Sequence, residues 1–266
     1  MMKTQSNQQN PKQGSTAKTI FLKVIPLVLT AWLAIYTLTM GIAVHKQVKA
    51  FQSQGNQGGD TLSWSSEEWQ LLKDKTFLEA RIALAGDDSI AMTIDFQDSI
   101  IRLETKGVVL REVKFGKVEI SRFFKALKPL SYAALFSKPF MITEIEGSIV
   151  KEPIQVKKAP RDSTEAAQNI TTVDTSRVEF VEWHLQLDSV FVVSFVQSER
   201  SFGQIDWPTL KYRLSRNYQT FAETKRDLLR FRLPAYQPEV TLFIPGIETK
   251  SFYRALPPNG KVALKF

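Results

Sequence analysis

The stretch AMTIDFQDSIIRLETKGVVLREVKF, residues 91–115, decides the fold class of this 266-residue chain. Large apolar residues alternate with small or polar ones along it, which is the period of a β-strand. Gln97-Asp98 and Lys106-Gly107 interrupt the alternation and predict turns. The stretch therefore predicts three antiparallel strands in a row. The alternating positions are Ile90, Met92, Ile94, Phe96, Ile101 and Leu103, and Val109 to Phe115 continue the pattern.

A helix is predicted just before these strands. Ser65 and Glu68 have the spacing of a capping box, in which each side chain binds the other residue's backbone N–H. Gly86 is a typical residue for the C-terminal end of such a helix. The residues expected to share one helical face are Trp69, Leu72, Thr76, Ala80 and Ala83.

An uncharged apolar segment, VIPLVLTAWLAIYTLTMGIAV (Val24 to Val44), precedes this helix. A bilayer core of about 30 Å needs about 20 apolar residues in a helix. The alternatives are a buried core helix, disfavoured because no charge interrupts the segment, and a cleaved signal peptide. The apolar run exceeds the roughly 7–15 residues of a signal-peptide core, and no A-x-A cleavage site follows it. We expect an uncleaved transmembrane helix at residues 20–45, in contact with the lipid bilayer through Val24 to Val44.

The lysines around the apolar segment predict its orientation. Four lysines precede it and two follow closely, and the positive-inside rule then places the N-terminus in the cytoplasm. The chain is accordingly expected to be a single-pass cell-membrane protein with an extracytoplasmic main domain. Residues 1–19 are predicted as a polar cytoplasmic tail, and residues 46–64, which include QSQGNQGGD, as a flexible tether.

The remaining chain alternates between strand and helix patterns. Ser121 is predicted to cap a short helix that ends at Pro129. Residues 151–177 are poor in large apolar residues and predict a linker or long excursion between a first lobe (65–150) and a second lobe (178–266). In the second lobe we expect a hairpin turning at Asp188-Ser189, a helix over 209–232, and strands over 239–244 and 261–266. The apolar stripe of that helix comprises Leu210, Leu214, Tyr218, Phe221 and Leu228.

These patterns together predict an α+β fold. It comprises one N-terminal transmembrane helix and a mostly antiparallel sheet domain of one or two lobes, with at least two amphipathic helices.

The charge distribution argues against a nucleic-acid partner. The net charge is +8, but six basic residues and no acidic one lie before Asp60, which leaves 29 basic against 27 acidic residues in the rest. Phosphate-backbone binding requires basic charge concentrated on the folded part. The chain has no cysteine, which excludes disulfides, thiolate metal sites and cysteine nucleophiles.

Candidate chemical groups are few. His184 alternates with Glu182 and Gln186 along a predicted strand, and we expect it to face solvent as an ordinary strand histidine. Glu144 and Glu146 share a strand face and are interpreted as part of a solvated edge. The sequence has no H-E-x-x-H motif, calcium-loop spacing or phosphate-binding glycine loop. We therefore expect no catalytic residue, no metal site and no cofactor, and favour a non-enzyme.

The C-terminal part is basic, with 11 Lys and Arg against 5 Asp and Glu from Gly203 onward. Four arginines lie off the apolar stripe of the helix over 209–232. They predict either a surface for an anionic partner or an ordinary solvated helix face with internal ion pairs. These residues are Arg213, Arg216, Arg226 and Arg230.

Residues 91–115 also resemble the first β-meander of L,D-transpeptidase catalytic domains, over about 25 of the 266 residues. That family's catalytic histidine-glycine and serine-histidine-glycine-cysteine motifs are absent from this sequence, so the resemblance implies a non-catalytic relative in the wall-building apparatus. We expect a membrane-anchored, non-catalytic module that binds an envelope protein or wall polymer. The alternative is an envelope enzyme of unfamiliar type, using carboxylate or Ser/Lys chemistry in a cleft between the lobes.

Overall fold

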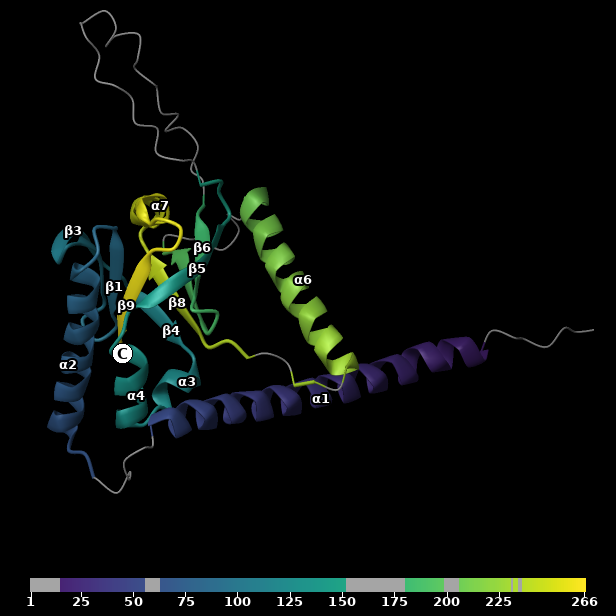
Figure 1. Cartoon of the computed structure of the whole chain (residues 1–266). Helices are drawn as coiled ribbons and strands as arrows, with labels where there is room; N and C mark the ends of the chain where they lie inside the picture. Colours follow the sequence, from purple (N-terminus) through teal and green to yellow (C-terminus); the bar gives the residue numbers. More distant parts are fainter. Residues whose placement is uncertain (1–14, 56–62, 152–179, 199–205, 231, 234–235) are drawn as a thin grey trace, which may run out of the picture.

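The computed structural model describes residues 15–55, 63–151, 180–198, 206–230, 232–233 and 236–266. It confirms the α+β fold, with an N-terminal apolar helix, one nine-stranded sheet and several further helices (Figure 1). The predicted tail up to residue 14, the tether over 56–62 and most of the predicted linker (152–177) lie outside the described residues.

The sheet is mostly antiparallel and has the order β3-β2-β1-β9-β5-β6-β7-β8-β4. Two pairs, β1 with β9 and β7 with β8, are parallel. The last strand of the chain and β4 each pair with strands from the other predicted lobe, so one sheet runs through both lobes. The strands are β1 (Ala91–Asp95), β2 (Ile100–Thr105), β3 (Val108–Lys114), β4 (Lys117–Ile120), β5 (Phe140–Gly147), β6 (Glu182–Leu187), β7 (Phe191–Gln197), β8 (Glu239–Ile244) and β9 (Lys261–Lys265).

The predicted turns are present, and left-handed backbone angles mark them. Lys106 and Gly107 have φ of 50° and 79° between β2 and β3. Asp188 and Ser189 have φ of 48° and 56° between β6 and β7. Two consecutive positive φ angles are typical of the tight turn that matches the twist of a hairpin.

The sheet curls strongly because its two edges are consecutive in the chain. β3 forms one edge and ends at Lys114, and β4 forms the other edge and begins at Lys117. Three peptide links span at most about 11 Å, so the edges meet at this point. The sheet is thus a partly open barrel, and its inner face forms one apolar core.

That core draws on both halves of the chain. Met92 and Ile94 of β1 lie in the same buried cluster as Trp183 of β6 and Val262 of β9. Short helices close the lower end of the barrel in Figure 1 and add many of its aromatic side chains. These helices are α3 (Arg122–Lys125) and α4 (Pro129–Phe136), and α7 (Gly246–Ala255) lies at the opposite end.

Pro129 begins a helix and does not end one, because the predicted short helix α3 already ends at Lys125. Ser121 caps α3 as predicted, and its side chain accepts from the backbone N–H of Phe123. Helix α4, which starts at Pro129 itself, was not predicted. A proline suits the first helical position because its missing N–H would have no partner there.

Helix α2 (Ser66–Ala85) covers the outer face of β9, β1 and β2, and the predicted capping box between Ser65 and Glu68 is confirmed. The predicted buried face is wrong in part, because Ala83 is exposed whereas Phe77 and Leu84 are buried. Since α2 covers that outer face, β1 is buried on both faces.

Under α2, paired charges complement the small apolar contacts. Glu104 of β2 accepts two hydrogen bonds from Arg81 of α2, at 3.3 and 2.9 Å, and a third from Thr93 at 3.1 Å. Lys265 of β9 contacts Asp74 of α2 at 2.8 Å and Asp95 of β1 at 3.2 Å.

Helix α1 (Ser15–Gly55) extends beyond the predicted membrane span at both ends. The prediction of a flexible tether from residue 46 is wrong up to Gly55. This part is helical because Val48 and Phe51 pack against the core, where the Phe51 ring lies 5.4 Å from Phe123 and 6.2 Å from Phe191. By contrast, the described residues Val24 to Ile35 are all exposed.

Candidate functional site

Helix α6 (Trp207–Leu229) covers the outer face of β6, β7 and β8, and it does so with its polar side. The amphipathic helix was predicted, but its buried side was not. Thr209 and Thr224 are buried, whereas Leu214, Tyr218 and Phe221 of the apolar stripe are exposed. The reason lies in the sheet, whose outer face here is polar while Trp183, Leu185 and Leu187 fill the barrel.

Ion pairs attach α6 to this polar face. Arg213 donates to Glu182 of β6 at 2.5 Å. Arg216 donates to Glu239 of β8 at 2.9 Å and to the Ser194 hydroxyl of β7 at 3.3 Å.

The four predicted arginines therefore separate into two pairs. Arg213 and Arg216 turn toward the sheet, where carboxylates neutralise them. Arg226 and Arg230 are exposed. The structure does not gather all four into one basic surface.

His184 lies beneath α6, and the expectation of a solvent-facing histidine is wrong. It is 9% exposed, and its Nδ1 forms a hydrogen bond with the Tyr212 hydroxyl. Burial, and secondarily the charge of Arg216, lowers the pKa of His184 to about 4, although Glu239 opposes this shift. The imidazole is neutral at pH 7, so its 3.6 Å approach to the Glu146 carboxylate is not an ion pair at that pH.

The interpretation of Glu144 and Glu146 as part of a solvated edge holds in part, since Glu144 is exposed and Glu146 is half-buried. Their strand, β5, lies inside the sheet order, but it pairs with β9 only at Phe140 and Met141, and at the two glutamates it pairs with β6 alone. The register places Glu146 opposite His184. Burial raises the pKa of Glu146, and the neighbouring Glu144 raises it further because two carboxylates repel each other when both are charged.

These groups line a cavity of about 640 Å³ between α6, the sheet and α1. Its charged lining is mainly acidic, with five carboxylates against Arg216. Such a cavity attracts a cationic or hydrogen-bonding ligand more readily than an anion. Its lining comprises Met40, Glu144, Glu146, His184, Gln186, Val192, Arg216, Gln219, Thr220, Glu223, Thr224, Asp227, Tyr236, Gln237 and Glu239.

Glu182, His184 and Gln186 alternate along one strand in the sequence. That alternation is the signal that could have revealed the polar face, but a sequence pattern does not show which helix covers it.

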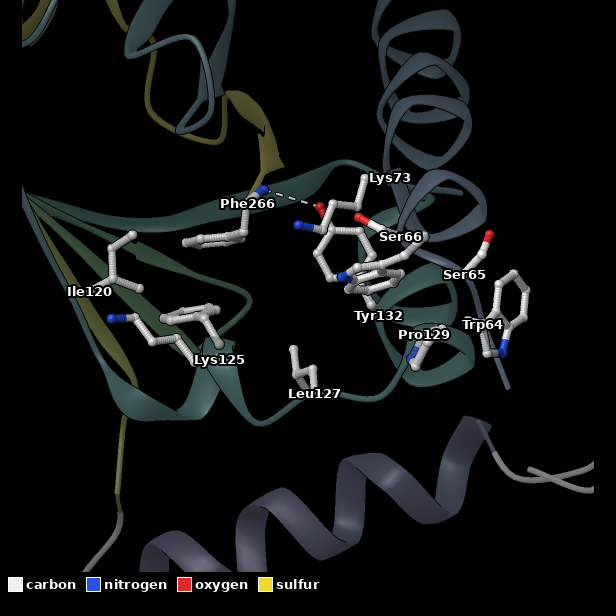
Figure 2. Close-up of a pocket in the computed structure, with 12 residues that line it drawn as sticks. Trp64, Ser65, Ser66, Lys73, Ile120, Lys125, Leu127, Pro129, Tyr132 and Phe266 are labelled. Carbon is white, nitrogen blue, oxygen red and sulfur yellow. Dashed lines mark hydrogen bonds between the residues drawn. The ribbon is translucent and has the colours of Figure 1, made fainter. Parts of the chain in front are cut away.

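A second pocket, of about 720 Å³, opens between α2, α3 and α4 at the lower end of the barrel. Figure 2 shows Leu127 and Tyr132 beside this space, with the backbone N–H of Phe266 donating to the Tyr132 hydroxyl at 3.0 Å. Lys73 and Lys125 also line it. The pocket is mostly apolar and contains no Asp or Glu among its described lining residues, which distinguishes it from the cavity under α6.

Among the residues that the structure describes, no cluster of His, Asp or Glu has the composition to hold a metal ion. No known protein family, curated protein sequence or solved structure matches this chain. The fold and the geometry of the chain's own residues therefore carry the functional inference.

Proposed function

We propose that the chain is a membrane-anchored, non-catalytic module that presents its α+β domain outside the cytoplasm and binds an envelope protein or wall polymer. The anchor is the apolar segment Val24 to Val44, with the N-terminus in the cytoplasm. The proposed role at the cell wall also draws on the resemblance of residues 91–115 to a wall-building family.

The architecture of α1 carries this proposal. Among the described residues, one helix is long and apolar enough to cross a membrane, over Val24–Gln52. Its apolar side chains remain exposed, with Leu27 at 68% and Leu38 at 67%, which is costly in water and favourable in lipid. Its C-terminal end is anchored in the domain core through Phe51. The helix would therefore hold the domain directly against the lipid bilayer around its apolar part.

The same continuity favours an uncleaved anchor over a signal peptide. From Tyr36 onward one side of α1 lies against the domain, and Ala43 is buried. Cleavage after Val44 would remove these contacts and expose the apolar groups beneath them.

Two measurements test the anchor. The intact mass of the purified chain should include the apolar segment, and alkaline carbonate should leave the chain in the membrane. A shortened chain, or release by carbonate, would refute the anchor. A reporter fused at the C-terminus tests orientation and should be active only outside the cytoplasm.

The edge strand β3 provides a surface for a protein partner. Val108, Val109 and Leu110 are consecutive and are 62%, 43% and 54% exposed. A sheet edge offers backbone donors and acceptors to an added strand, and apolar side chains strengthen that pairing.

A photo-crosslinking residue at Val109 should capture an envelope protein in cells. The same residue at Ile82, on the exposed face of α2, is the matched control. Equal products from both positions would contradict partner binding at β3.

The cavity under α6 supports the enzymatic alternative, because it brings a buried neutral imidazole close to a carboxyl group with a raised pKa. Such pairs occur at catalytic sites. Incubation with purified cell-wall sacculi tests this function. Release of soluble fragments by the full chain, lost in Glu146→Gln, would establish the enzyme in place of the non-catalytic module.

A further inference from the structure

The outer face of α6 is an apolar surface opposite the cavity. We define this outer face by its exposed side chains, which are too large and too numerous for an ordinary solvated helix. They are Trp207 at 72%, Leu214 at 57%, Tyr218 at 72%, Phe221 at 49% and Leu229 at 71%.

The charges of α6 are distributed asymmetrically around this outer face. Both acidic residues of the helix, Glu223 and Asp227, line the cavity on the inner side. Lys211 and Lys225 are exposed and lie at helical spacing from Tyr218, among the apolar residues. The outer face therefore combines apolar side chains with positive charge, which is the composition of helices that lie in an anionic lipid surface.

The position of α6 indicates the same partner. Figure 1 shows α6 as the outermost element on the side from which the N-terminal half of α1 projects. The Phe221 ring contacts Trp32, within the predicted span, with centroids 5.7 Å apart. The outer face of α6 and the apolar segment of α1 thus form one continuous apolar surface, so lipid around the segment also reaches the helix.

We propose that α6 is a second membrane contact, with its outer face against the lipid that surrounds the exposed part of α1, Val24 to Ile35. This inference rests on the proposed anchor. Lys211 and Lys225 would contact anionic headgroups, while the ion pairs of Arg213 and Arg216 hold the domain on the opposite side of the helix. The contact would fix the orientation of the barrel on the membrane.

The absence of cysteine from the chain permits a direct test. The full chain carrying Tyr218→Cys and a nitroxide label is reconstituted in nanodiscs that contain anionic lipid. Ile82→Cys, at a 73% exposed site on the opposite side of the domain, is the matched control. At each site, the accessibility of the label to oxygen is divided by its accessibility to a water-soluble nickel complex. This ratio should be severalfold higher at position 218 than at position 82. Leu229→Cys provides an independent second site.

Equal nickel accessibility at positions 218 and 82 would overturn the membrane contact. A second copy of the chain could cover the outer face instead of lipid. Dipolar coupling between labels in discs that contain two chains, together with nickel access in discs that contain one, would establish that outcome and overturn the membrane contact. Replacing Lys211 and Lys225 by glutamine should reduce the oxygen preference severalfold in anionic discs, and an unchanged preference would count against the charge argument. Carbonate extraction distinguishes failure of the anchor from failure of the α6 contact. If carbonate leaves the chain in the membrane while the label on α6 is in water, only the α6 contact is refuted.

Discussion

The buried imidazole of His184 should make the domain sensitive to mild acid. In the folded chain its pKa is about 4, whereas an unfolded histidine has a pKa near 6.5. Between these values the unfolded state binds a proton that the folded state does not, so the free energy of unfolding falls as the pH falls. The perturbation is acidification from pH 7 to about pH 5.

The magnitude follows from the difference between the two pKa values. Each pKa unit corresponds to about 1.4 kcal/mol, and the proton uptake accumulated between pH 7 and pH 5 amounts to about 2 kcal/mol. Glu146 acts in the opposite direction, because its raised pKa lets the folded state take up a proton first. The other groups around the imidazole are Tyr212, Arg216 and Glu239.

The variant His184→Gln separates the histidine contribution from the rest. Urea unfolding of the full chain in detergent, followed by near-ultraviolet circular dichroism, reports on the stacked rings of Trp183 and Phe195 in the core. Between pH 7 and pH 5, His184→Gln should lose about 2 kcal/mol less stability than the unaltered chain. His45→Gln removes the other histidine, from an exposed position on α1, and serves as the control.

Equal acid sensitivity in the unaltered chain and in His184→Gln would refute the assignment of a neutral, buried imidazole beneath α6. It would also remove the strongest support for an unusual chemical environment in the cavity.

Three further predictions concern stability and use the same urea assay. Ser65→Ala removes the cap of α2 and should cost about 1 kcal/mol, whereas an unchanged midpoint would show that the capping box contributes nothing. Gly147→Ala places a Cβ 2.9 Å from a tyrosine ring and should cost about 1–3 kcal/mol, while Gly116→Ala, which has open space around its Cβ, should cost less than half of that. Glu104→Ala should cost about 2–3 kcal/mol because it leaves Arg81 without its buried partner, and a loss no larger than that of an exposed ion pair would contradict this role.

Local features were predictable from the sequence because neighbouring residues encode them. The capping box at Ser65, the paired positive φ angles at Lys106-Gly107 and the cap at Ser121 depend on a few consecutive residues. The apolar segment of α1 was equally evident, since its length and lack of charge are local properties. Pro129 shows the limit of such signals, because one residue type can mark either end of a helix.

The candidate site depended on contacts between segments that lie far apart in the chain. The alternation of His184 was visible, but its burial required α6, which begins 23 residues later in the sequence, at Trp207. The partial burial of Glu146 likewise depends on β6 and α6, which a pattern along β5 does not show. Sequence periodicity identifies the two faces of an element and does not say which face another element covers.

By itself the sequence determined the apolar helix, the strand and helix periods, the hairpin turns and therefore the α+β class, since each of these follows from local sterics and the spacing of apolar side chains. Only the tertiary structure decided that the sheet curls until β3 and β4 meet and that α6 turns its charged side inward. The physical reason is that the curled sheet buries its apolar inner face while α6 pairs its charges with the polar outer face, and both outcomes join segments that no local window of residues contains.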